Sequence, residues 1–599
     1  MIKFDNFVYR RGVMSLDQSV TVGRPRLNKM IIKNLGCIGS YPVEIELDDI
    51  VVLVGPNNVG KSTILRAYEV IMSEGSKEAN LSLDDFPNGE VKQDALPEIE
   101  LQTVVYDNSP GERWIRVDEI TGEKYVREKW TWSNPGPPRR QGFDVNIGDW
   151  ANEVPWGAAN VANSRRPQPH RVEAFSDPQN QAKDIIKILN TFLEERVKEL
   201  KTIDNNVENE KTDYEILLEK IEQIQKKIVE DSKSEINKVE EEVSDIVNQV
   251  FPGYKIKFDA RPEDDIDKTI NLFKANPKLL MGPENGFQSA IERQGSGARR
   301  TLLWAALRYI SESAGGKTKK GAQNKRPHVL LLDEPELCLH PNAIREACKV
   351  LYDLPQSSNW QVMVTTHSPS FIDLSRNNTT IVRVSRDKDG RIAGTTLFRP
   401  SRVKLDDNDR ENLKLLNIFD PYVAEFFFGG RSVIVEGDTE YTAFKHVIAS
   451  KPEEFKDVHI IRARGKATVA SLVKVLNHFG SKYSVLHDSD SPLRKDQKGN
   501  PAWGSNHRIL DAVNAHPDRS KVRLLASIPN LEEAFFGEEA KGEKPYNALL
   551  KIKNDPLKFK KIEDLLRALI DHSCIVPEGS IEWFEIEDLE RALNAYKLV

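Results

Sequence analysis

The sequence predicts an α/β protein in two parts, each built from apolar strands that end in phosphate-binding or metal-binding residues. Three observations predict this class. A glycine-rich loop at 55–62 follows an apolar strand, and a second apolar strand ends in an acid pair at 333–334. From about residue 401 onward, a new strand–helix alternation places acidic residues after its strands. Strands that alternate with helices favour a parallel sheet, in which the strand ends gather at one edge.

The loop at 55–62 has the sequence Gly-Pro-Asn-Asn-Val-Gly-Lys-Ser, which satisfies every fixed position of the Gly-x-x-x-x-Gly-Lys-Ser phosphate loop. The backbone N–H groups of such a loop close around the β-phosphate, and the helix that begins there adds its positive dipole end. The lysine supplies a positive charge, and the serine hydroxyl binds Mg²⁺. The sequence therefore predicts an ATP site with contacts from Gly55, Asn58, Gly60, Lys61, Ser62 and Thr63.

A second nucleotide-binding element is the apolar strand that ends in Asp333 and Glu334. It has the form of a Walker B segment, in which the first acid belongs to the Mg²⁺ shell and the second polarises the attacking water. We therefore expect Asp333 to act at Mg²⁺ together with Ser62, and Glu334 to be catalytic in ATP hydrolysis. A buried strand with a capping acid pair is the weaker alternative beside a phosphate loop.

Three further segments indicate the class of ATPase. Residues 294–300 precede an apolar helix and resemble an ABC signature motif, whose Ser296 and Gly297 would cap the γ-phosphate of an opposing subunit. Residues 336–341 resemble the loop after Walker B in SMC-like ATPases, and His367 resembles the ABC switch histidine. The long separation between phosphate loop and signature favours the SMC-like branch over a transporter subunit. No convincing Q-loop is present, and Gln168 is only a weak candidate.

Inserted segments fill that separation. Residues 98–160 hold five of the nine tryptophans and predict an antiparallel β elaboration, in which the tryptophans more often pack a small sheet than stack on bases. Heptad spacing within 214–250 predicts helices in an insertion at about 176–253, and it is compatible with dimerisation or with an intramolecular hairpin. The basic loop at 315–326 is more often a solvated surface loop than a phosphate contact.

Acidic residues follow the strands of the C-terminal part. Glu436 follows one apolar strand, and Asp488 and Asp490 form an Asp-x-Asp pair at the end of another. The segment 527–533 offers further acids after a third strand. Because the carboxyl ends of neighbouring parallel strands converge on one crevice, these acids are expected to lie together. Oxygen-rich clusters of this kind suit Mg²⁺ or Mn²⁺.

The order of these acids resembles the Toprim domain of topoisomerases, primases and related nucleases. Together with the preceding ATPase motifs, it resembles the OLD (overcoming lysogenisation defect) nuclease family, to which the Gabija antiphage nuclease subunit belongs. The resemblance covers roughly residues 27–599. It implies an ABC/SMC-like ATPase fold followed by a Toprim α/β domain. It also implies an ATP-binding DNA endonuclease that cuts or nicks with two divalent ions, often in phage defence.

The resemblance also assigns oxygen ligands to the two ions. The first ion would have Glu436 and Glu440, the shared position would be Asp488, and the second ion would have Asp490, Ser527 and Glu532. A family lysine that stabilises transition-state charge would be Lys544, although Lys541 and Lys551 compete with it. The resemblance further implies DNA as partner, a homodimer or higher oligomer, and a helicase-like partner protein.

Composition limits these expectations. The net charge of −7 gives no global attraction to nucleic acid, so DNA would be held by local basic patches or by bound metal ions. The sequence contains no apolar run long enough for a membrane helix and no signal-like apolar core at its N-terminus. Its four cysteines show neither disulfide nor metal-ligand spacing. Together these features favour a cytoplasmic protein without a membrane partner.

The motifs divide the chain into an N-terminal arm at 1–26, an ATPase domain at 27–400 and a Toprim nuclease domain at 401–599. The main alternative function is an SMC-like or RecF-like DNA-repair ATPase whose Toprim part binds DNA without cutting it. The intact set of acids argues against that alternative. A topoisomerase would need a domain for its nucleophilic tyrosine, and no segment of the sequence provides one. A primase would need a template-binding zinc or helical module, and the scattered cysteines exclude the zinc version.

Overall fold

The computed structural model describes most of the chain. The described residues are 25–119, 121–173, 279–282, 286–314, 326–357, 360–374, most of 376–403, 405–478, 480–493, 498–538 and 542–598, with single residues within 177–188 and 216–227. Three sequence features therefore lie wholly or mainly outside the described residues: the N-terminal arm, the heptad segment and the basic loop before Arg326. None of the described helices is both long and apolar enough to cross a membrane.

The chain forms two compact units. The first comprises Met1–Pro169, Asn324–Val329 and Met363–Val599, and the second comprises His170–Gln323 and Leu330–Val362. The phosphate loop and the whole C-terminal part belong to the first unit, whereas the signature segment and the acid pair at 333–334 belong to the second.

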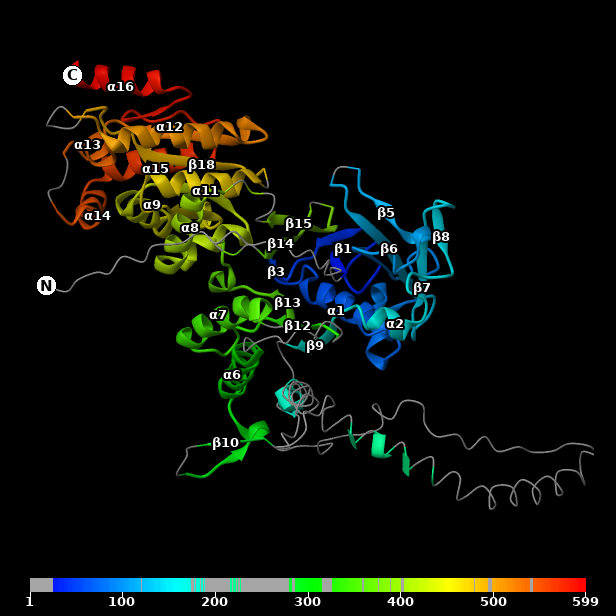
Figure 1. The fold of residues 1–599 in the computed structure, drawn as a ribbon. Coiled ribbons are helices and arrows are strands. Elements are labelled where there is room, and N and C mark those ends of the chain that lie inside the picture. Colours follow the sequence, from blue (N-terminus) through cyan, green and yellow to red (C-terminus); the bar gives the residue numbers. More distant parts are fainter. Residues whose placement is uncertain are drawn as a thin grey trace, which may run out of the picture. The chain divides into compact units, whose positions relative to one another are not determined.

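An antiparallel sheet forms the β elaboration of the first unit, with the strand order β2-β1-β4-β6-β7-β8 and β5 paired to β6 (Figure 1). Trp130 and Trp132 are completely buried in this region and Trp114 is nearly so, as packing of a small sheet requires. The strands are β1 (Arg26–Lys33), β2 (Val43–Glu46), β4 (Glu98–Val104), β5 (Arg116–Val117), β6 (Lys124–Thr131), β7 (Arg139–Asp144) and β8 (Asp149–Ala151).

A six-stranded sheet carries the nucleotide-binding motifs, in the order β15-β14-β3-β13-β12-β9. Strand β14 runs parallel to β3 and antiparallel to β15. All residues of β3 and β12 are buried, because these runs of branched apolar residues form the centre of a sheet. The strands are β3 (Ile50–Val54), β9 (Gln168–Val172), β12 (His328–Asp333), β13 (Trp360–Thr365), β14 (Thr379–Arg386) and β15 (Ile392–Phe398).

The remaining elements of the N-terminal two thirds are short strands and helices. The short strands are β10 (Leu280–Met281) and β11 (Ser289–Ala290); the α-helices are α1 (Lys61–Met72), α2 (Ala159–Asn163), α6 (Ser296–Ala314) and α7 (Pro341–Ser357); the 3₁₀ helices are η1 (Lys77–Ala79), η2 (Leu83–Asp85), η3 (Pro87–Gly89), η4 (Glu112–Trp114), η6 (Ile291–Arg293) and η8 (Pro369–Phe371).

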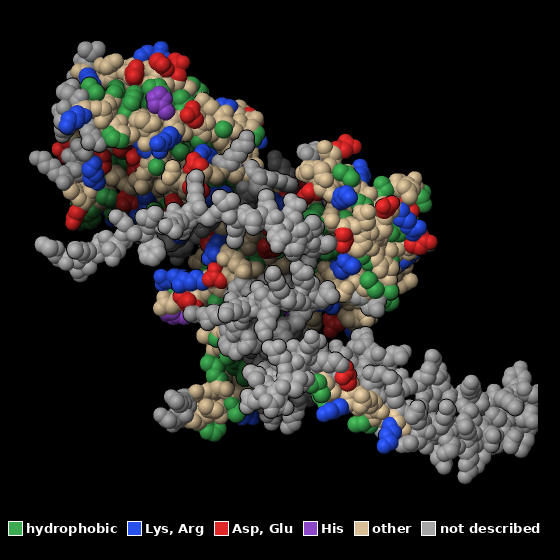
Figure 2. All heavy atoms as spheres, in the orientation of Figure 1, with side chains coloured by type: hydrophobic (Ala, Val, Ile, Leu, Met, Phe, Trp, Pro, Cys, Tyr) green, Lys and Arg blue, Asp and Glu red, His purple; other side chains and the backbone are tan. Residues whose placement is uncertain are grey.

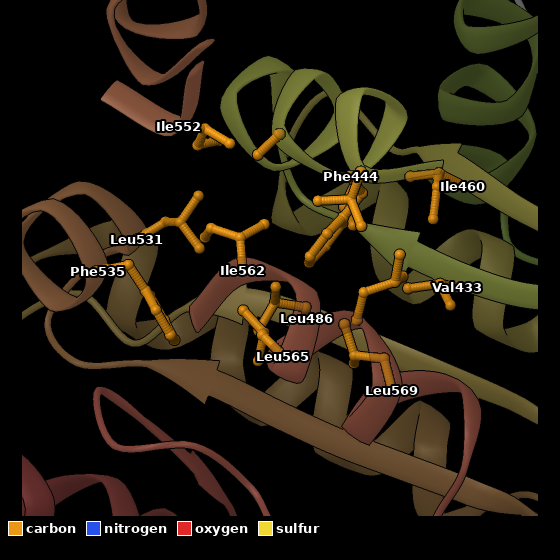
Figure 3. Close-up of a cluster of buried hydrophobic side chains, with 14 of the residues drawn as sticks. Val433, Phe444, Ile460, Leu486, Leu531, Phe535, Ile552, Ile562, Leu565 and Leu569 are labelled. Carbon is orange, nitrogen blue, oxygen red and sulfur yellow. The ribbon is translucent and has the colours of Figure 1, made fainter. Parts of the chain in front are cut away.

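The C-terminal part is built on a five-stranded sheet in the order β17-β16-β18-β19-β20. The first four strands are parallel, and β20 is antiparallel to β19. Val433 and Leu486 of this sheet pack against Phe444 of α9 and against Leu565 and Leu569 of α15 (Figure 3). This dry core holds the strands in place beneath their polar ends.

The elements of this part have the following bounds. They are α8 (Asp407–Phe419), η9 (Pro421–Phe428), β16 (Arg431–Val435), α9 (Asp438–Ser450), α10 (Pro452–Phe455), β17 (Val458–Arg462), α11 (Lys466–His478), β18 (Tyr483–Asp488), α12 (Pro501–Asn514), η10 (Arg519–Lys521), β19 (Val522–Ser527), α13 (Leu531–Phe536), α14 (Lys544–Asn554), α15 (Pro556–Ile570), β20 (Ser580–Glu582) and α16 (Ile586–Leu598).

Candidate functional sites

The phosphate loop connects β3 to α1 through two residues with left-handed backbone. Asn58 has φ 61° and Gly60, at the N-cap of α1, has φ 93°. Gly55 has φ 140°, and a Cβ added to it would lie 2.1 Å from the carbonyl oxygen of Val384 in β14. Only glycine fits there, so the loop is held against β14 with its N–H groups available to a phosphate.

Lys61 is the charged centre of this loop. Its Nζ donates to the carbonyl oxygens of Gly55 at 3.1 Å and Pro56 at 2.8 Å, and it lies 2.9 Å from Nε2 of His367. His367 follows β13, whose end is tied to β3 because the N–H of Thr366 donates to the carbonyl of Leu53. The structure thus brings together the lysine of the phosphate loop and the histidine that resembles the ABC switch histidine, although 306 positions separate them.

The two hydroxyls that follow Lys61 differ in their surroundings. Ser62 is exposed at the start of α1, where it is accessible to an incoming ion. The hydroxyl of Thr63 lies 3.4 Å from Sγ of Cys37. The weak Q-loop candidate, Gln168, is the first residue of β9, where its backbone N–H donates to the carbonyl oxygen of Pro327.

The second unit contains the Walker B acids and the signature segment. Asp333 is buried at the end of β12, and Glu334 follows with a left-handed φ of 45°. Arg300 of α6 donates to the carbonyl oxygen of Glu334 at 3.2 Å. A Cβ on Gly297 would lie 2.9 Å from the carbonyl oxygen of Cys338. The start of α6, where Ser296 is the first residue, therefore packs on the loop that follows β12.

The C-terminal sheet brings its strand ends together as parallel order requires. Val435 pairs with Leu486, and Asp488 pairs with Ser527, so the residues after β16 lie beside the ends of β18 and β19. The backbone N–H of Asp488 donates to Oε2 of Glu436 at 3.2 Å. The first acid and the Asp-x-Asp segment are thus in direct contact.

Two helix N-termini add further acids to the same place. Glu440 lies in the first turn of α9 and Glu532 in the first turn of α13, and both are buried. The hydroxyl of Thr439 donates to Oε1 of Glu532 at 3.1 Å. The N–H of Leu531 donates to Oδ1 of Asp488 at 2.9 Å. Two turns of helix and two strand ends therefore contribute to one carboxylate cluster.

Burial and mutual repulsion raise the pKa values within this cluster. Burial raises the pKa of Glu440 to about 7, and the charges of Glu436 and Glu532 add to the effect. Burial also raises the pKa of Asp488 well above its usual value, with further contributions from Glu440 and Glu436. A bound cation would relieve this repulsion, because a nearby opposite charge favours the ionised carboxylate.

The donor set fits a divalent cation of the hard, oxygen-binding kind. It offers carboxylates together with Ser527, whose buried Oγ has no hydrogen-bond partner among the described residues. In the side-chain arrangement that the described residues adopt, no three His, Cys, Asp or Glu side chains close around a single point. The acids are near enough to perturb one another, so small side-chain rotations would be required for them to share an ion.

Asp490 and its lysine neighbour form the edge of the cluster. Asp490 has a left-handed φ of 58°, and its carboxylate accepts a hydrogen bond from Nζ of Lys466, which also donates to Oδ1 of Asn506 at 2.9 Å. Among the expected lysines, Lys544 lies 3.8 Å from Oε2 of Glu532. Lys551 instead pairs with Glu538 at 3.0 Å, and Lys541 is outside the described residues.

The sequence interpretation missed Lys466. A signal for it exists, because Arg464-Gly465-Lys466 follows an apolar strand and opens a helix. The phosphate loop has the same order of strand, glycine, lysine and helix.

Comparison with known proteins identifies both parts. A family model described as AAA ATPase domain matches residues 26–125 and 158–372, together more than half of the chain. A model described as Overcoming lysogenization defect protein-like, TOPRIM domain matches residues 427–490. The fold and the two sites therefore define a hydrolase that joins an ATPase to a Toprim domain. The chain belongs to the AAA ATPase domain family, and its Toprim domain is of the OLD type, as predicted.

Two curated relatives align with this chain over most of their length. The Old nuclease of Escherichia phage P2 is 24% identical over 450 residues, which cover 73% of each chain. The OLD nuclease of Thermus scotoductus is 23% identical over 552 residues, which cover 87% of this chain and 93% of the relative.

Solved structures of SMC heads also align with the chain. An Smc head bound to the C-terminal winged-helix domain of ScpA aligns with a TM-score of 0.33 and 16% identity, covering 62% of this chain and 98% of that one. The SMC head domain from Thermotoga maritima aligns with a TM-score of 0.29 and 14% identity, covering 62% and 98%.

Proposed function

We propose that this chain is an ATP-binding, metal-dependent DNA endonuclease in which the Toprim acids hydrolyse a phosphodiester and the ATPase gates their access to DNA. One observation carries the proposal: the half-buried Glu436 and Asp488 and the buried Glu440 and Glu532 form a mutually repelling cluster at the ends of parallel strands. Leaving such a cluster uncompensated is costly, and structural cores avoid it. The cluster is therefore best explained as a cation site.

The acids would hold two divalent ions, Mg²⁺ or Mn²⁺. When bound, these ions supply an activated water and stabilise the leaving oxygen of an in-line displacement. The proposed ligands are Glu436 and Glu440 at one ion, Asp488 at both, and Asp490, Ser527 and Glu532 at the other. The N–H of Leu531 and the hydroxyl of Thr439 orient Asp488 and Glu532, respectively.

The nucleotide site would act as the gate. Lys61 and His367 bind the terminal phosphates of ATP, Ser62 and Asp333 share its Mg²⁺, and Glu334 polarises the attacking water. In a homodimer, Ser296 and Gly297 of one copy would cap the nucleotide held by the other. Binding of ATP would then change how two copies associate around DNA.

The resemblance of the motifs to the OLD family implies three further proposals: a role in antiphage defence, an assembly of two or more copies, and a helicase-like partner protein. The first is tested by plaque counts on cells that express the chain or its Glu436→Gln variant. Equal plaque counts from both strains for a broad set of phages would argue against a defensive role for the nuclease site.

The nuclease proposal is tested by cleavage of plasmid and linear DNA with Mg²⁺ or Mn²⁺, with and without ATP. We expect Glu436→Gln to lower cleavage by about 100-fold or more, since one acid–base or ligand group commonly contributes that much. Glu453→Gln, an exposed acid of α10, is the matched control. Lys61→Ala then shows whether ATP activates or restrains cutting.

The rival DNA-repair ATPase predicts a different result. It would bind DNA and hydrolyse ATP, but neither ion would support cleavage, and Glu436→Gln would behave like the wild-type protein. That outcome would contradict the nuclease proposal.

A further inference from the structure

Glu436 lines a pocket of about 600 Å³ in the C-terminal part of the chain. One wall is the turn from Ala463 to Thr468, which joins β17 to α11. The rest of the lining comes from α8, with Asn412, Leu415 and Leu416, and from α12, with Ala502 and Ser505. The pocket is thus contiguous with the carboxylate cluster, but most of its lining has no role in holding the proposed ions.

The wall formed by the turn is basic and firmly placed. Arg464 has a left-handed φ of 59°, followed by Gly465 with φ 128°. The N–H of Gly465 donates to the carbonyl oxygen of Glu436 at 2.9 Å, which fixes the turn to the strand end that carries the first acid. Arg464 is exposed, and its guanidinium has no hydrogen-bond or ion-pair partner among the residues that the structure describes.

Lys466 connects this wall to the acids. It is only 6% exposed, and its Nζ donates to the carboxylate of Asp490 and to Oδ1 of Asn506. A buried ammonium requires such partners, and here one partner is a proposed metal ligand. Because Lys466 also lines the pocket and begins α11, its charge adds to the unpaired N–H groups and positive dipole end of that helix.

The larger apolar side chains of the pocket lining come from α8. Leu415 is 49% exposed and Leu416 is buried beside it on α8. A pocket of this volume, lined by apolar leucine side chains and a few polar groups, suits a ligand of small-molecule size. A single nucleotide matches such a pocket, because its phosphate is anionic and its base and sugar present larger, less polar faces.

The charge of the rest of the surface shows why a local phosphate-binding site is needed. On the face shown in Figure 2, basic and acidic side chains are interspersed over the described surface of the chain. With a net charge of −7 as well, DNA contact needs specific cations rather than a general field.

We propose that this pocket takes the nucleotide that flanks the scissile phosphodiester, with Arg464 and Lys466 at its phosphate and Leu415 and Leu416 beside its base or sugar. The proposal rests on the proposed nuclease function and adds the position of the substrate strand. Lys466 then has two functions: it positions Asp490 and contacts the phosphate.

The test separates DNA binding from cutting. A fluorescent DNA duplex is titrated with full-length protein in Ca²⁺, which replaces Mg²⁺, over a range of salt concentrations. We expect Arg464→Ala to weaken binding by about tenfold and to reduce the slope of log K against log salt by about 1, because one phosphate contact is lost. Arg508→Ala, an exposed α12 arginine outside the pocket lining, should keep the wild-type slope.

Cleavage kinetics in Mg²⁺ distinguish the two basic residues. Arg464→Ala should raise KM and leave kcat nearly unchanged. Lys466→Met should lower kcat, and Lys466→Arg should restore part of it, since arginine keeps the charge. ATP hydrolysis and the unfolding temperature report whether each variant is folded, and Lys466→Arg and Arg464→Ala keep the test valid if Lys466→Met does not fold.

The outcomes separate the two proposals. Wild-type protein that binds the duplex without cutting it, together with a lower slope for Arg464→Ala, would reject the nuclease and keep the pocket only as a site that binds a DNA phosphate. Cutting by the wild type with unchanged binding, slope and KM in Arg464→Ala would reject the pocket and keep the nuclease. An equal loss of slope in Arg508→Ala would attribute DNA binding to general charge and would also reject the pocket. Absence of DNA binding by the wild type would reject both.

Discussion

Lys61 and Glu440 are both buried charged residues, but their surroundings differ. The ammonium of Lys61 has carbonyl acceptors at 3.1 and 2.8 Å and a histidine nitrogen at 2.9 Å, so its charge is compensated within the chain. Glu440 instead lies among other acids, and its pKa rises to about 7. Lys61 therefore stays charged and can bind an anion such as a phosphate, whereas the surroundings of Glu440 favour binding of a proton or a cation.

This difference predicts a pH dependence for Glu440. The pKa of Glu440 is about 7 in the folded chain and 4.5 in the unfolded chain. Between these two pH values the folded state therefore binds more protons than the unfolded state. In EDTA, the free energy of unfolding should therefore fall as pH rises from 4.5 to 7. We expect Glu440→Gln to reduce that fall by up to about 3 kcal/mol. Denaturant unfolding at several pH values measures it.

Two controls accompany this measurement. The exposed Glu453→Gln should keep the wild-type pH dependence, and Mg²⁺ should stabilise the wild type more strongly at pH 7.5 than at pH 5, because protons and cations compete for the same oxygens. An identical pH dependence in Glu440→Gln and wild type would show that Glu440 does not titrate in this range.

At the scale of secondary-structure elements, one connection recurs. A buried strand ends, a glycine follows within the turn, and a helix begins: β3 with Gly60 and α1, β16 with Gly437 and α9, and β17 with Gly465 and α11. Each connection places backbone N–H groups and a helix N-terminus at the end of a strand. The phosphate loop, the first acids and the basic wall of the pocket all arise from it.

The contact between the phosphate loop and β14 yields a prediction for these elements. Gly55→Ala would place Cβ 2.1 Å from the carbonyl oxygen of Val384 on a backbone with φ 140°, so the loop must shift. We expect ATP affinity to fall by on the order of tenfold or more and stability to fall by about 1–3 kcal/mol. Gly39→Ala, where an added Cβ meets nothing within 4 Å, is the control. Calorimetric ATP binding and thermal unfolding measure both effects; unchanged ATP binding would show that the loop tolerates the shift.

At the scale of the whole molecule, the first unit contains a direct contact between the sheet that carries the phosphate loop and the segment that leads into the Toprim acids. Arg383 of β14, a strand paired in parallel with β3, donates to the carbonyl oxygens of Phe427 at 3.1 Å and Phe426 at 3.4 Å in η9. Helix η9 directly precedes β16 and Glu436. A shift of the phosphate loop can therefore reach the first acid through packed elements.

This contact predicts that Arg383→Met weakens the coupling between ATP and DNA cutting. The variant should retain ATP hydrolysis and metal-dependent cleavage, while the ratio of cleavage rates with and without ATP moves toward one. The exposed Arg116→Met, on β5, should keep the wild-type ratio. Burial lowers the pKa of Arg383, so stability is measured in parallel by thermal unfolding. An unchanged ratio in a folded Arg383→Met would exclude this route of coupling.

The sequence by itself predicts the chemistry that we propose for both sites, because their motifs are local. A phosphate loop, an acid pair after an apolar strand and an Asp-x-Asp segment each take their geometry from one turn, so Lys61, Asp333 and Asp488 could be proposed as site residues without a fold. The burial of Trp114, Trp130 and Trp132 agrees with the small antiparallel sheet predicted for residues 98–160.

Only the tertiary structure decided which distant residues meet. His367 reaches Lys61 across 306 positions, and Thr439 reaches Glu532 across 93. Lys466 pairs with Asp490 and lines a pocket that no spacing in the sequence indicates. The physical reason is that strand order and helix packing set these contacts, whereas sequence patterns report only neighbours within a few residues.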